Sequence, residues 1–331
     1  MTRKRELARA DRVLPGLWRL RLPLPWPGVP HGNAWAIAAG DGIVLVDTGI
    51  HGPGGQRQLE LALDQAGLRL EHVRLVVCTH AHSDHYGLAK PITETTGCEL
   101  WIHPDLDHMR NYIVDPEGAF ERRLEGARRN GVPAEVVETL AAGRGSQKSG
   151  VAGLVEPDVE LVNGVEVETD LGVWQVHETP GHAPSHVVLH QPERRLLLSG
   201  DHLLGRVSLY YDFGNSPDPA GEFLNSLDVV DGLDVDLILA GHGRPVRGAR
   251  ELAEANRTLV GERVERVRQA LGDGPKTAFE IVPSLLGGDP PDVLRTVWAM
   301  AETMVYLTHL QVREEAVSED EDGVDRWHLS A

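Results

Sequence analysis

The densest cluster of potentially reactive side chains is THAHSDH (79–85), where three histidines and an aspartate fall within the six positions 80–85. Imidazole nitrogens and carboxylate oxygens are the usual protein ligands of Zn²⁺. On a loop, His80 and His82 can point into one coordination sphere, while Asp84 and His85 face a second. A lone HxH pair would be weak evidence, but HxHxDH is far more specific. The segment therefore predicts a metal site.

Three further potential ligands each follow a stretch that is typical of a strand. They are His182 in ETPGHAPSH, Asp201 in LLLSGDH and His242 in ILAGHG. Because strand ends from one sheet meet at one edge, each of these side chains can converge on the same rim. We therefore expect all three to lie beside the HxHxDH segment.

In these motifs the sequence resembles the metallo-β-lactamase superfamily, and the resemblance spans roughly residues 12–250. The HxHxDH motif, a distant histidine, a bridging aspartate and a final histidine occur here in the family's order. The resemblance implies one metal held by His80, His82 and His182, and a second held by Asp84, His85 and His242. Asp201 would bridge them. Two divalent ions are implied, and zinc is preferred, although iron and manganese accept the same ligands.

The expected chemistry is hydrolysis by a metal-bound hydroxide. Two ions that share a water lower its pKa from about 15.7 to about 7. The catalytic candidates are Asp201 and Asp84, because Asp84 can also pass a proton to the leaving group. Asp47 in VLVDTG matches the family's DTG, which implies a carboxylate that orients ligands; a turn cap is the alternative. His186 matches GHxxxH and is left out of the ligand set.

Two neighbouring tyrosines are candidates for contact with the substrate. Tyr210 and Tyr211 follow the strand that carries Asp201. A phenol there can donate a hydrogen bond to an oxyanion, and a packed aromatic ring is the alternative. His31, His51 and His103 match no motif position and are interpreted as surface or turn histidines.

The elements that must position these residues form two similar halves. Short apolar runs at 17–25, 34–40, 42–49, 73–80 and 99–103 read as strands, with helices near 56–68 and 86–95. Strands recur within 159–169, 173–179, 186–190, 194–201 and 235–243, with a helix near 219–231. The expected fold class is α/β, a four-layer αβ/βα sandwich in a catalytic domain spanning 1–250. Residues 104–155 interrupt the pattern and are interpreted as a helical insertion over one edge.

The remaining residues, 251–331, are expected to form a small helical domain. Helices at 262–271, 277–286 and 292–310, followed by short segments, resemble a winged helix. Similar tails occur in lactamase-like endoribonucleases and in acyl-carrier thioesterases. The acidic stretch SEDEDGVD (318–325) is interpreted as a solvated turn. The domain is expected to cover the sandwich, close the pocket or mediate self-association, so a homodimer is conceivable.

The charge balance argues against nucleic acid as the partner. The chain has 50 acidic and 32 basic side chains, a formal net charge of −18. Residues 255–331 hold 8 Lys and Arg against 14 Asp and Glu, a balance of −6, where a phosphate-binding groove is expected to be basic. Basic residues gather only in the insertion, which forms either a lid for an anionic substrate or a solvated helix face: Arg110, Arg122, Arg123, Arg128 and Arg129.

The favoured function is therefore hydrolysis of an acyl substrate, either a small molecule or carrier-bound. TPGHAPSH and SGDH look like motifs of hydroxyacylglutathione hydrolases and related thioesterases and lactonases. A metal-dependent endoribonuclease or phosphodiesterase is the alternative, and a ligand-sensing regulator without activity is a third reading. Two cysteines, no signal peptide and no apolar run long enough for a membrane span favour a cytoplasmic protein without membrane contact.

Overall fold

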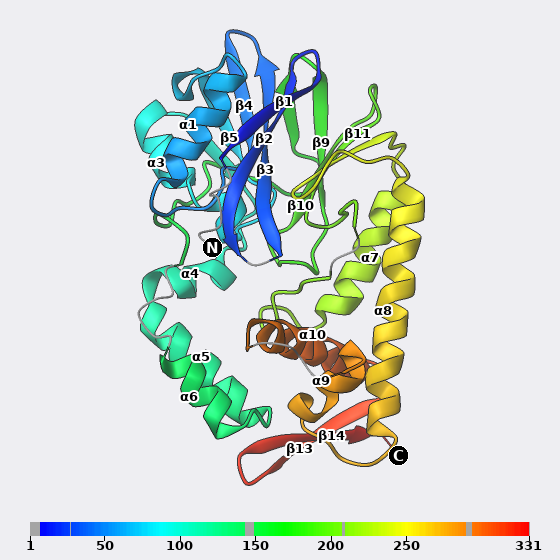
Figure 1. Ribbon diagram of the computed structural model, residues 1–331. Coiled ribbons are helices and arrows are strands. Elements are labelled where there is room, and N and C mark those ends of the chain that lie inside the picture. Colours follow the sequence, from blue (N-terminus) through cyan, green and yellow to red (C-terminus); the bar gives the residue numbers. More distant parts are fainter. Residues whose placement is uncertain (1–6, 27, 143–148, 207–208, 289–292, 331) are drawn as a thin grey trace.

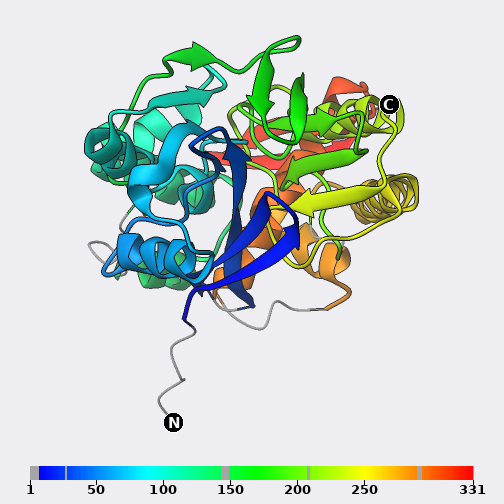
Figure 2. The same ribbon diagram turned by 90° about the horizontal axis from the view of Figure 1, so that it is seen from above.

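Two β-sheets pack face to face at the centre of the molecule, with helices on their outer faces (Figures 1 and 2). The computed structural model describes residues 7–26, 28–142, 149–206, 209–288 and 293–330. The first sheet has seven strands in chain order: β1 (Arg9–Leu14), β2 (Leu17–Trp26), β3 (Val29–Ala39), β4 (Gly42–Val46), β5 (Val73–Val77), β6 (Glu99–Ile102) and β7 (Val159–Glu160). The second has five, in the order β12 (Leu237–Ala240), β11 (Leu196–Gly200), β10 (Val187–Gln191), β9 (Gly172–Glu178) and β8 (Glu166–Thr169).

Continuous apolar runs make the inner strands buried on both faces. In β11, Leu196 and Leu198 pack between the two sheets, whereas Leu197 packs against the helices. In β4, Val44 faces the other sheet and Leu45 faces the helical layer. Successive side chains of a strand point to opposite faces, so such runs require cover on both sides.

The two helical layers supply that cover. On the first sheet lie α1 (Gly55–Gln65), η1 (Leu70–His72) and α3 (Ala89–Thr96), and on the second lie α7 (Pro219–Asp231) and α8 (Ala249–Leu271). Helix α7 begins where its sequence predicts, because Asp218 accepts a hydrogen bond from the Gly221 amide and Pro219 occupies the first helical turn. The four-layer αβ/βα sandwich is thus confirmed.

Two boundaries differ from those expected from sequence. Strand β1 was not foreseen, because RADRVL is charged and half exposed, yet it pairs antiparallel with β2 at the edge of the sheet. Helix α8 begins at Ala249 rather than at residue 262, and its apolar side chains pack onto α7 and the C-terminal helices. In both cases tertiary contacts stabilise a strand or helical turns that the local pattern does not predict.

Only the first helix of the insertion after β6 lies on the sandwich as expected, where Met109 packs into the core between the first sheet and its helices. The insertion forms α4 (Asp107–Val114), α5 (Pro116–Arg129) and α6 (Ala134–Ala142), and its last two helices lead away from the sandwich toward the C-terminal hairpin (Figure 1); residues 143–148 lie outside the described part. Leu124 of α5 and Val137 of α6 pack with Phe279 and Met300 of the C-terminal helices. The insertion therefore docks on the C-terminal part of the chain through an apolar cluster of its own.

The chain ends in a helical unit that consists of α8, α9 (Ala278–Leu286), α10 (Val293–Val312) and a hairpin of β13 (Ala316–Glu321) and β14 (Val324–Leu329). Most of the acidic stretch 318–325 lies in these strands, so its interpretation as a solvated turn was wrong. Only Asp322 and Gly323 form the turn, with φ values of 54° and 83°. An Asp-Gly pair suits a tight hairpin because both residues tolerate positive φ. Within the described residues, no helix is long and apolar enough to cross a membrane.

Candidate metal centre

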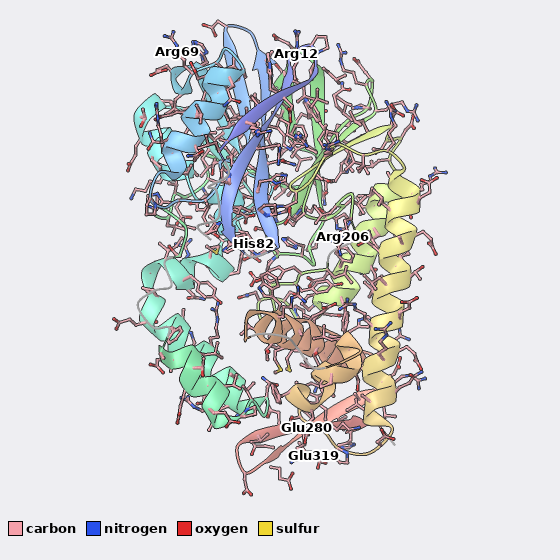
Figure 3. All side chains as sticks on the ribbon, in the orientation of Figure 1. Arg12, Arg69, His82, Arg206, Glu280 and Glu319 are labelled. Carbon is pink, nitrogen blue, oxygen red and sulfur yellow. The ribbon has the colours of Figure 1, made fainter. Side chains whose placement is uncertain are left out.

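The expected ligand residues meet at one end of the sandwich. The HxHxDH segment begins in the loop after β5 and ends in α2 (Ser83–Tyr86), and the other three residues follow β9, β11 and β12. Three groups of side chains bring their ligand atoms within 4.8 Å of one another: His80, His82 and His182; His80, His85 and Asp201; and Asp84, His85 and His242. His82 lies at the end of the sandwich that faces the insertion and the C-terminal helices (Figure 3). Thus the structure brings together all seven residues selected from the sequence.

Asp201 lies between the group of His80, His82 and His182 and the group of Asp84, His85 and His242. Its Oδ1 is 3.4 Å from His85 Nε2, and its Oδ2 is 3.7 Å from His182 Nε2 and 3.2 Å from His242 Nε2. Gly241 permits this approach, since a Cβ there would overlap the Asp201 carboxylate and the His85 ring. One carboxylate therefore reaches residues of both groups.

Outer hydrogen bonds fix which nitrogen of each ring faces the centre. His182 Nδ1 lies 2.9 Å from the carbonyl oxygen of Tyr210, and His242 Nδ1 lies 3.0 Å from that of His31. A carbonyl oxygen only accepts, so in each ring Nδ1 carries the proton and donates it. In the neutral ring this leaves the lone pair on Nε2, which points toward Asp201.

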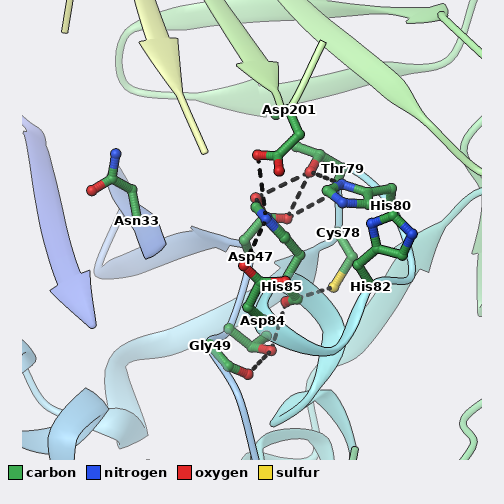
Figure 4. Close-up of polar contacts among 12 residues, drawn as sticks. Asn33, Asp47, Gly49, Cys78, Thr79, His80, His82, Asp84, His85 and Asp201 are labelled. Atoms are coloured by element: carbon green, nitrogen blue, oxygen red, sulfur yellow. Dashed lines mark hydrogen bonds and ion pairs between the residues drawn. The ribbon is translucent and has the colours of Figure 1, made fainter. Parts of the chain in front are cut away.

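Asp47 orients the HxHxDH loop. Its Oδ1 accepts from the Thr79 amide at 2.8 Å, and its Oδ2 lies 2.9 Å from His85 Nδ1 (Figure 4). Asp47 itself has a φ of 62°, a conformation that Asp adopts more readily than most residues. The position that sequence suggested for Asp47, behind a possible ligand, agrees with these contacts.

The buried charges favour positive charge at the centre of the cluster. Burial lowers the pKa of His85, but the carboxylates of Asp84, Asp201 and Asp47 outweigh burial and raise that pKa to about 9. Burial lowers the pKa of His182 to about 4, so that ring is neutral near pH 7. The carboxylates and the neutral imidazoles together attract a cation.

Several inward-facing atoms have no hydrogen-bond partner, although they are buried. Within the described residues these include Nε2 of His80 and His85, Oδ2 of Asp84 and Oδ1 of Asp201. A buried polar atom without a partner costs free energy, and native proteins rarely leave several together unless a ligand takes them up. Imidazole nitrogens beside carboxylate oxygens are the donors that divalent ions prefer, so these residues fit such ions.

The two tyrosines lie on opposite sides of their segment. Tyr210 is 42% exposed, and its ring centroid is 5.6 Å from that of His82. Tyr211 is buried and packs between Phe223 of α7 and Tyr306 of α10. Tyr211 therefore belongs to the core, and we retain only Tyr210 as a residue near the substrate.

The remaining histidines considered from sequence take supporting or peripheral positions. His186 Nε2 accepts from the Asp201 amide at 3.1 Å, so it supports Asp201 and is not in the three groups. His103 pairs with Glu178, 3.1 Å away, and His51 is exposed. His31 contributes its carbonyl oxygen to the site, which its side chain could not have indicated.

Three residues around the cluster were given no role from the sequence. His108 of α4 is buried and lies 3.3 Å from Ser185 Oγ. Asp212 Oδ2 lies 3.6 Å from His82 Nε2. Asn33 of β3 donates from Nδ2 to the Ala240 carbonyl at 2.8 Å, which ties the first sheet to the loop before His242. None carries a local motif, and each contact joins residues far apart in sequence.

The Arg-rich insertion is largely neutralised within the chain. Each of its five arginines has a protein partner: Arg110 with Asp107 and Glu156, Arg122 with Asp115, Arg123 with Tyr112, Arg128 with Glu125, and Arg129 with Asp320 and Asp325. This pairing favours the solvated helix face over the lid for an anionic substrate.

Comparison with known proteins yields one family. Residues 27–242 match the family model described as the metallo-beta-lactamase superfamily. The chain is 26% identical to a probable metallo-hydrolase of Bacillus subtilis, YqjP, over 85% of this chain and 88% of that protein. It is 24% identical to the human acyl-coenzyme A thioesterase MBLAC2 over 64% of this chain and 73% of that protein. A crystal structure of a metallo-beta-lactamase family protein from Thermus thermophilus has a TM-score of 0.80 and 29% identity, covering 96% of this chain and 100% of that one.

Proposed function

Because the chain belongs to the metallo-β-lactamase superfamily and is a hydrolase, we propose that it uses two divalent metal ions to hydrolyse an acyl substrate. The observation that carries the proposal is the cluster of buried imidazole nitrogens and carboxylate oxygens that have no hydrogen-bond partner among the described residues. A hydrolase without bound metal would have no use for such an arrangement, which costs stability.

We assign the ligands from the first and the third of the three groups described above. His80, His82 and His182 would hold one ion, while Asp84, His85 and His242 would hold the other, with Asp201 between them. Zinc is the ion we propose, since imidazole and carboxylate suit it and it has no redox chemistry. When bound, the pair would lower the pKa of a shared water and polarise the bond under attack.

The protein's own side chains would set the geometry of the reaction. Asp84 Oδ2 lies 3.3 Å from His242 Nε2, and Asp84 would receive the proton from the attacking water and pass it to the leaving group. The hydroxyl of Tyr210, a residue that is 42% exposed, would donate a hydrogen bond to the oxyanion of the tetrahedral intermediate. Asp47 and His186 would hold ligands in place without contacting the substrate.

A thioester, lactone or ester is the substrate class that we favour. The segments TPGHAPSH and SGDH resemble those of glyoxalase II-like enzymes, and one relative is named an acyl-coenzyme A thioesterase. The net charge of −18 gives phosphodiester polymers no general electrostatic attraction. These points support an acyl bond over a phosphodiester bond.

The test is to measure metal per chain by mass spectrometry and turnover of a thioester, a lactone, bis(nitrophenyl) phosphate and single-stranded RNA. We expect close to two metals and turnover of an acyl substrate, reduced at least about 100-fold by Asp201→Ala. Asp234→Ala, which changes an exposed aspartate paired with Arg195, is the matched control and should leave activity intact. Cleavage of RNA or phosphodiester alone would replace the substrate class, and a purified protein with less than about half a metal per chain and no turnover would refute the proposal.

A further inference from the structure

The segment Tyr210–Asp212 contacts two of the proposed ligands at once. The Tyr210 carbonyl accepts from His182 Nδ1 at 2.9 Å, and the Asp212 amide donates to the His182 carbonyl at 3.0 Å. The Asp212 carboxylate lies 3.6 Å from His82 Nε2. His82 Nδ1 in turn is 3.0 Å from His182 Nε2. The segment therefore lies behind both rings, on the side away from their shared centre.

The middle residue of the segment anchors it to the C-terminal helices. The Tyr211 ring is buried, 5.7 Å from Phe223 and 6.1 Å from Tyr306 of α10 between ring centroids. The Tyr306 hydroxyl donates to Glu302 at 2.7 Å, and Glu302 pairs with Arg263 of α8 at 2.6 Å. The match to the superfamily ends at residue 242, so this support comes from a part of the chain outside it.

The other half of the cluster, which consists of Asp84, His85 and His242, has different contacts behind its rings. His85 is held by Asp47, which follows β4, and His242 is held by the carbonyl of His31 in β3. Both contacts come from the first sheet. Asp47 also reaches His80 through the Thr79 hydroxyl, which lies 3.0 Å from His80 Nδ1, whereas the contacts of the segment Tyr210–Asp212 are to His82 and His182. A change in that segment should therefore act mainly on the half that contains His82 and His182.

We propose that Asp212 is a positioning residue for His82, and that the segment Tyr210–Asp212 conveys the support of α10 to the His80, His82 and His182 half of the centre. The proposal rests on the metal centre proposed above. A carboxylate beside Nε2 keeps the proton on that nitrogen, so the lone pair of Nδ1 faces His182 and the centre. The same carboxylate makes the ring a stronger donor to a cation.

The first test measures metal affinity in Asp212→Ala and Asp212→Asn. The full-length apoprotein is titrated with Co²⁺, whose visible absorption reports coordination, in competition with a chelator. We expect one of the two binding steps to weaken about 10- to 100-fold in Asp212→Ala, while the other keeps its wild-type affinity. Asparagine places an amide oxygen near Nε2 but removes the negative charge, so Asp212→Asn should lie between wild type and alanine.

A matched control removes a carboxylate from another histidine. Glu178 lies 3.1 Å from His103, which is in none of the ligand groups, so Glu178→Gln should leave both binding steps unchanged. If Glu178→Gln weakens the same step as Asp212→Ala, the effect of Asp212 is a general loss of stability and the proposal is wrong.

The second test separates the Tyr211 ring from its hydroxyl. Tyr211→Ala leaves a cavity against Tyr306 and Phe223, and we expect it to weaken the same binding step as Asp212→Ala. Tyr211→Phe retains the ring and should bind Co²⁺ as the wild type does. Unchanged affinity in Tyr211→Ala, with circular dichroism confirming that the variant is folded, would overturn the link to α10.

The outcomes distinguish this inference from the proposed function. A wild-type protein that binds no Co²⁺ in either step would remove the metal centre and the inference together. Two wild-type binding steps that Asp212→Ala leaves unaltered would overturn the inference alone. Selective loss of one step in both Asp212→Ala and Tyr211→Ala supports the inference whatever substrate the enzyme hydrolyses.

Discussion

Charged and polar side chains gather in two regions of the molecule, and they differ in what their atoms contact. At the proposed metal centre, buried atoms such as His80 Nε2 and Asp201 Oδ1 lack a hydrogen-bond partner among the described residues. In the C-terminal unit and the insertion docked on it, charges have protein partners, as in Arg263 with Glu302 and Arg129 with Asp325. Unpartnered buried atoms indicate a binding site, whereas paired charges indicate a structural contact.

The largest expected effect comes from removal of the metals. A chelator should lower both the melting temperature and the free energy of unfolding, because ions that bind only the folded state stabilise it. Each ion at about 1,000 times its Kd contributes about 4 kcal/mol. The measurement is thermal unfolding by circular dichroism before and after dialysis against chelator, followed by re-addition of Zn²⁺.

Recovery on re-addition is the control for damage by the chelator. Because the charges of the C-terminal unit pair within the protein, that unit should keep its structure when the metal ions are removed. The near-ultraviolet circular dichroism of its aromatic side chains should therefore change little. A melting temperature that chelation leaves unaltered, in a protein whose metal content has been shown to fall to zero, would show that the histidine cluster is not stabilised by cations.

The sequence predicted which seven side chains meet, because the requirement is largely local. HxHxDH places four donors within six positions at the end of β5, and strand-end positions place His182, Asp201 and His242 on the same rim. Buried apolar strands force this convergence, since their C-terminal ends share one edge. The same reasoning gave the four layers, which need only strands covered on both faces.

What sequence missed depends on contacts between distant segments. Asp212 reaches His82 across more than a hundred residues, and the local pattern gives no sign of it. The adjacent residues Tyr210 and Tyr211 could not be told apart either, because the packing of α10 decides which ring is buried. The path of the insertion, which docks on the C-terminal helices, was equally beyond local patterns.

The titration of His108 tests whether a buried histidine beside the ligand groups, but in none of them, acts on stability. His108 is a buried histidine of the insertion, 6.0 Å from the His82 ring, yet it belongs to none of the ligand groups. Burial is the main cause that lowers its pKa, to about 4. An unfolded histidine has a pKa of about 6.5, so between about pH 6.5 and pH 4 the unfolded chain takes up a proton that the folded chain does not.

Stability from His108 is therefore complete above about pH 6.5 and falls as the pH drops toward 4, by about 3 kcal/mol in all. His108→Asn cannot titrate, so its unfolding free energy should fall less over this range than that of the wild type. Urea unfolding at several pH values in metal-free protein measures the difference. Identical slopes for the two proteins would mean that His108 is solvated or already charged in the folded state.

The smallest expected effect comes from Arg129, which tests whether the insertion is a lid or a structural element. Its side chain is half exposed and pairs with Asp320 and Asp325 of the C-terminal hairpin. Exposed pairs contribute little, so Arg129→Ala should lower the melting temperature by no more than about 2 °C and leave metal content unchanged. Arg263→Ala, which breaks the more buried pair with Glu302, should lower it several-fold more. The opposite result would be a raised KM for an anionic thioester in Arg129→Ala, with unaltered thermal stability. It would mean that the paired arginines bind the substrate. Pairing within the chain would then not distinguish structural charges from functional ones.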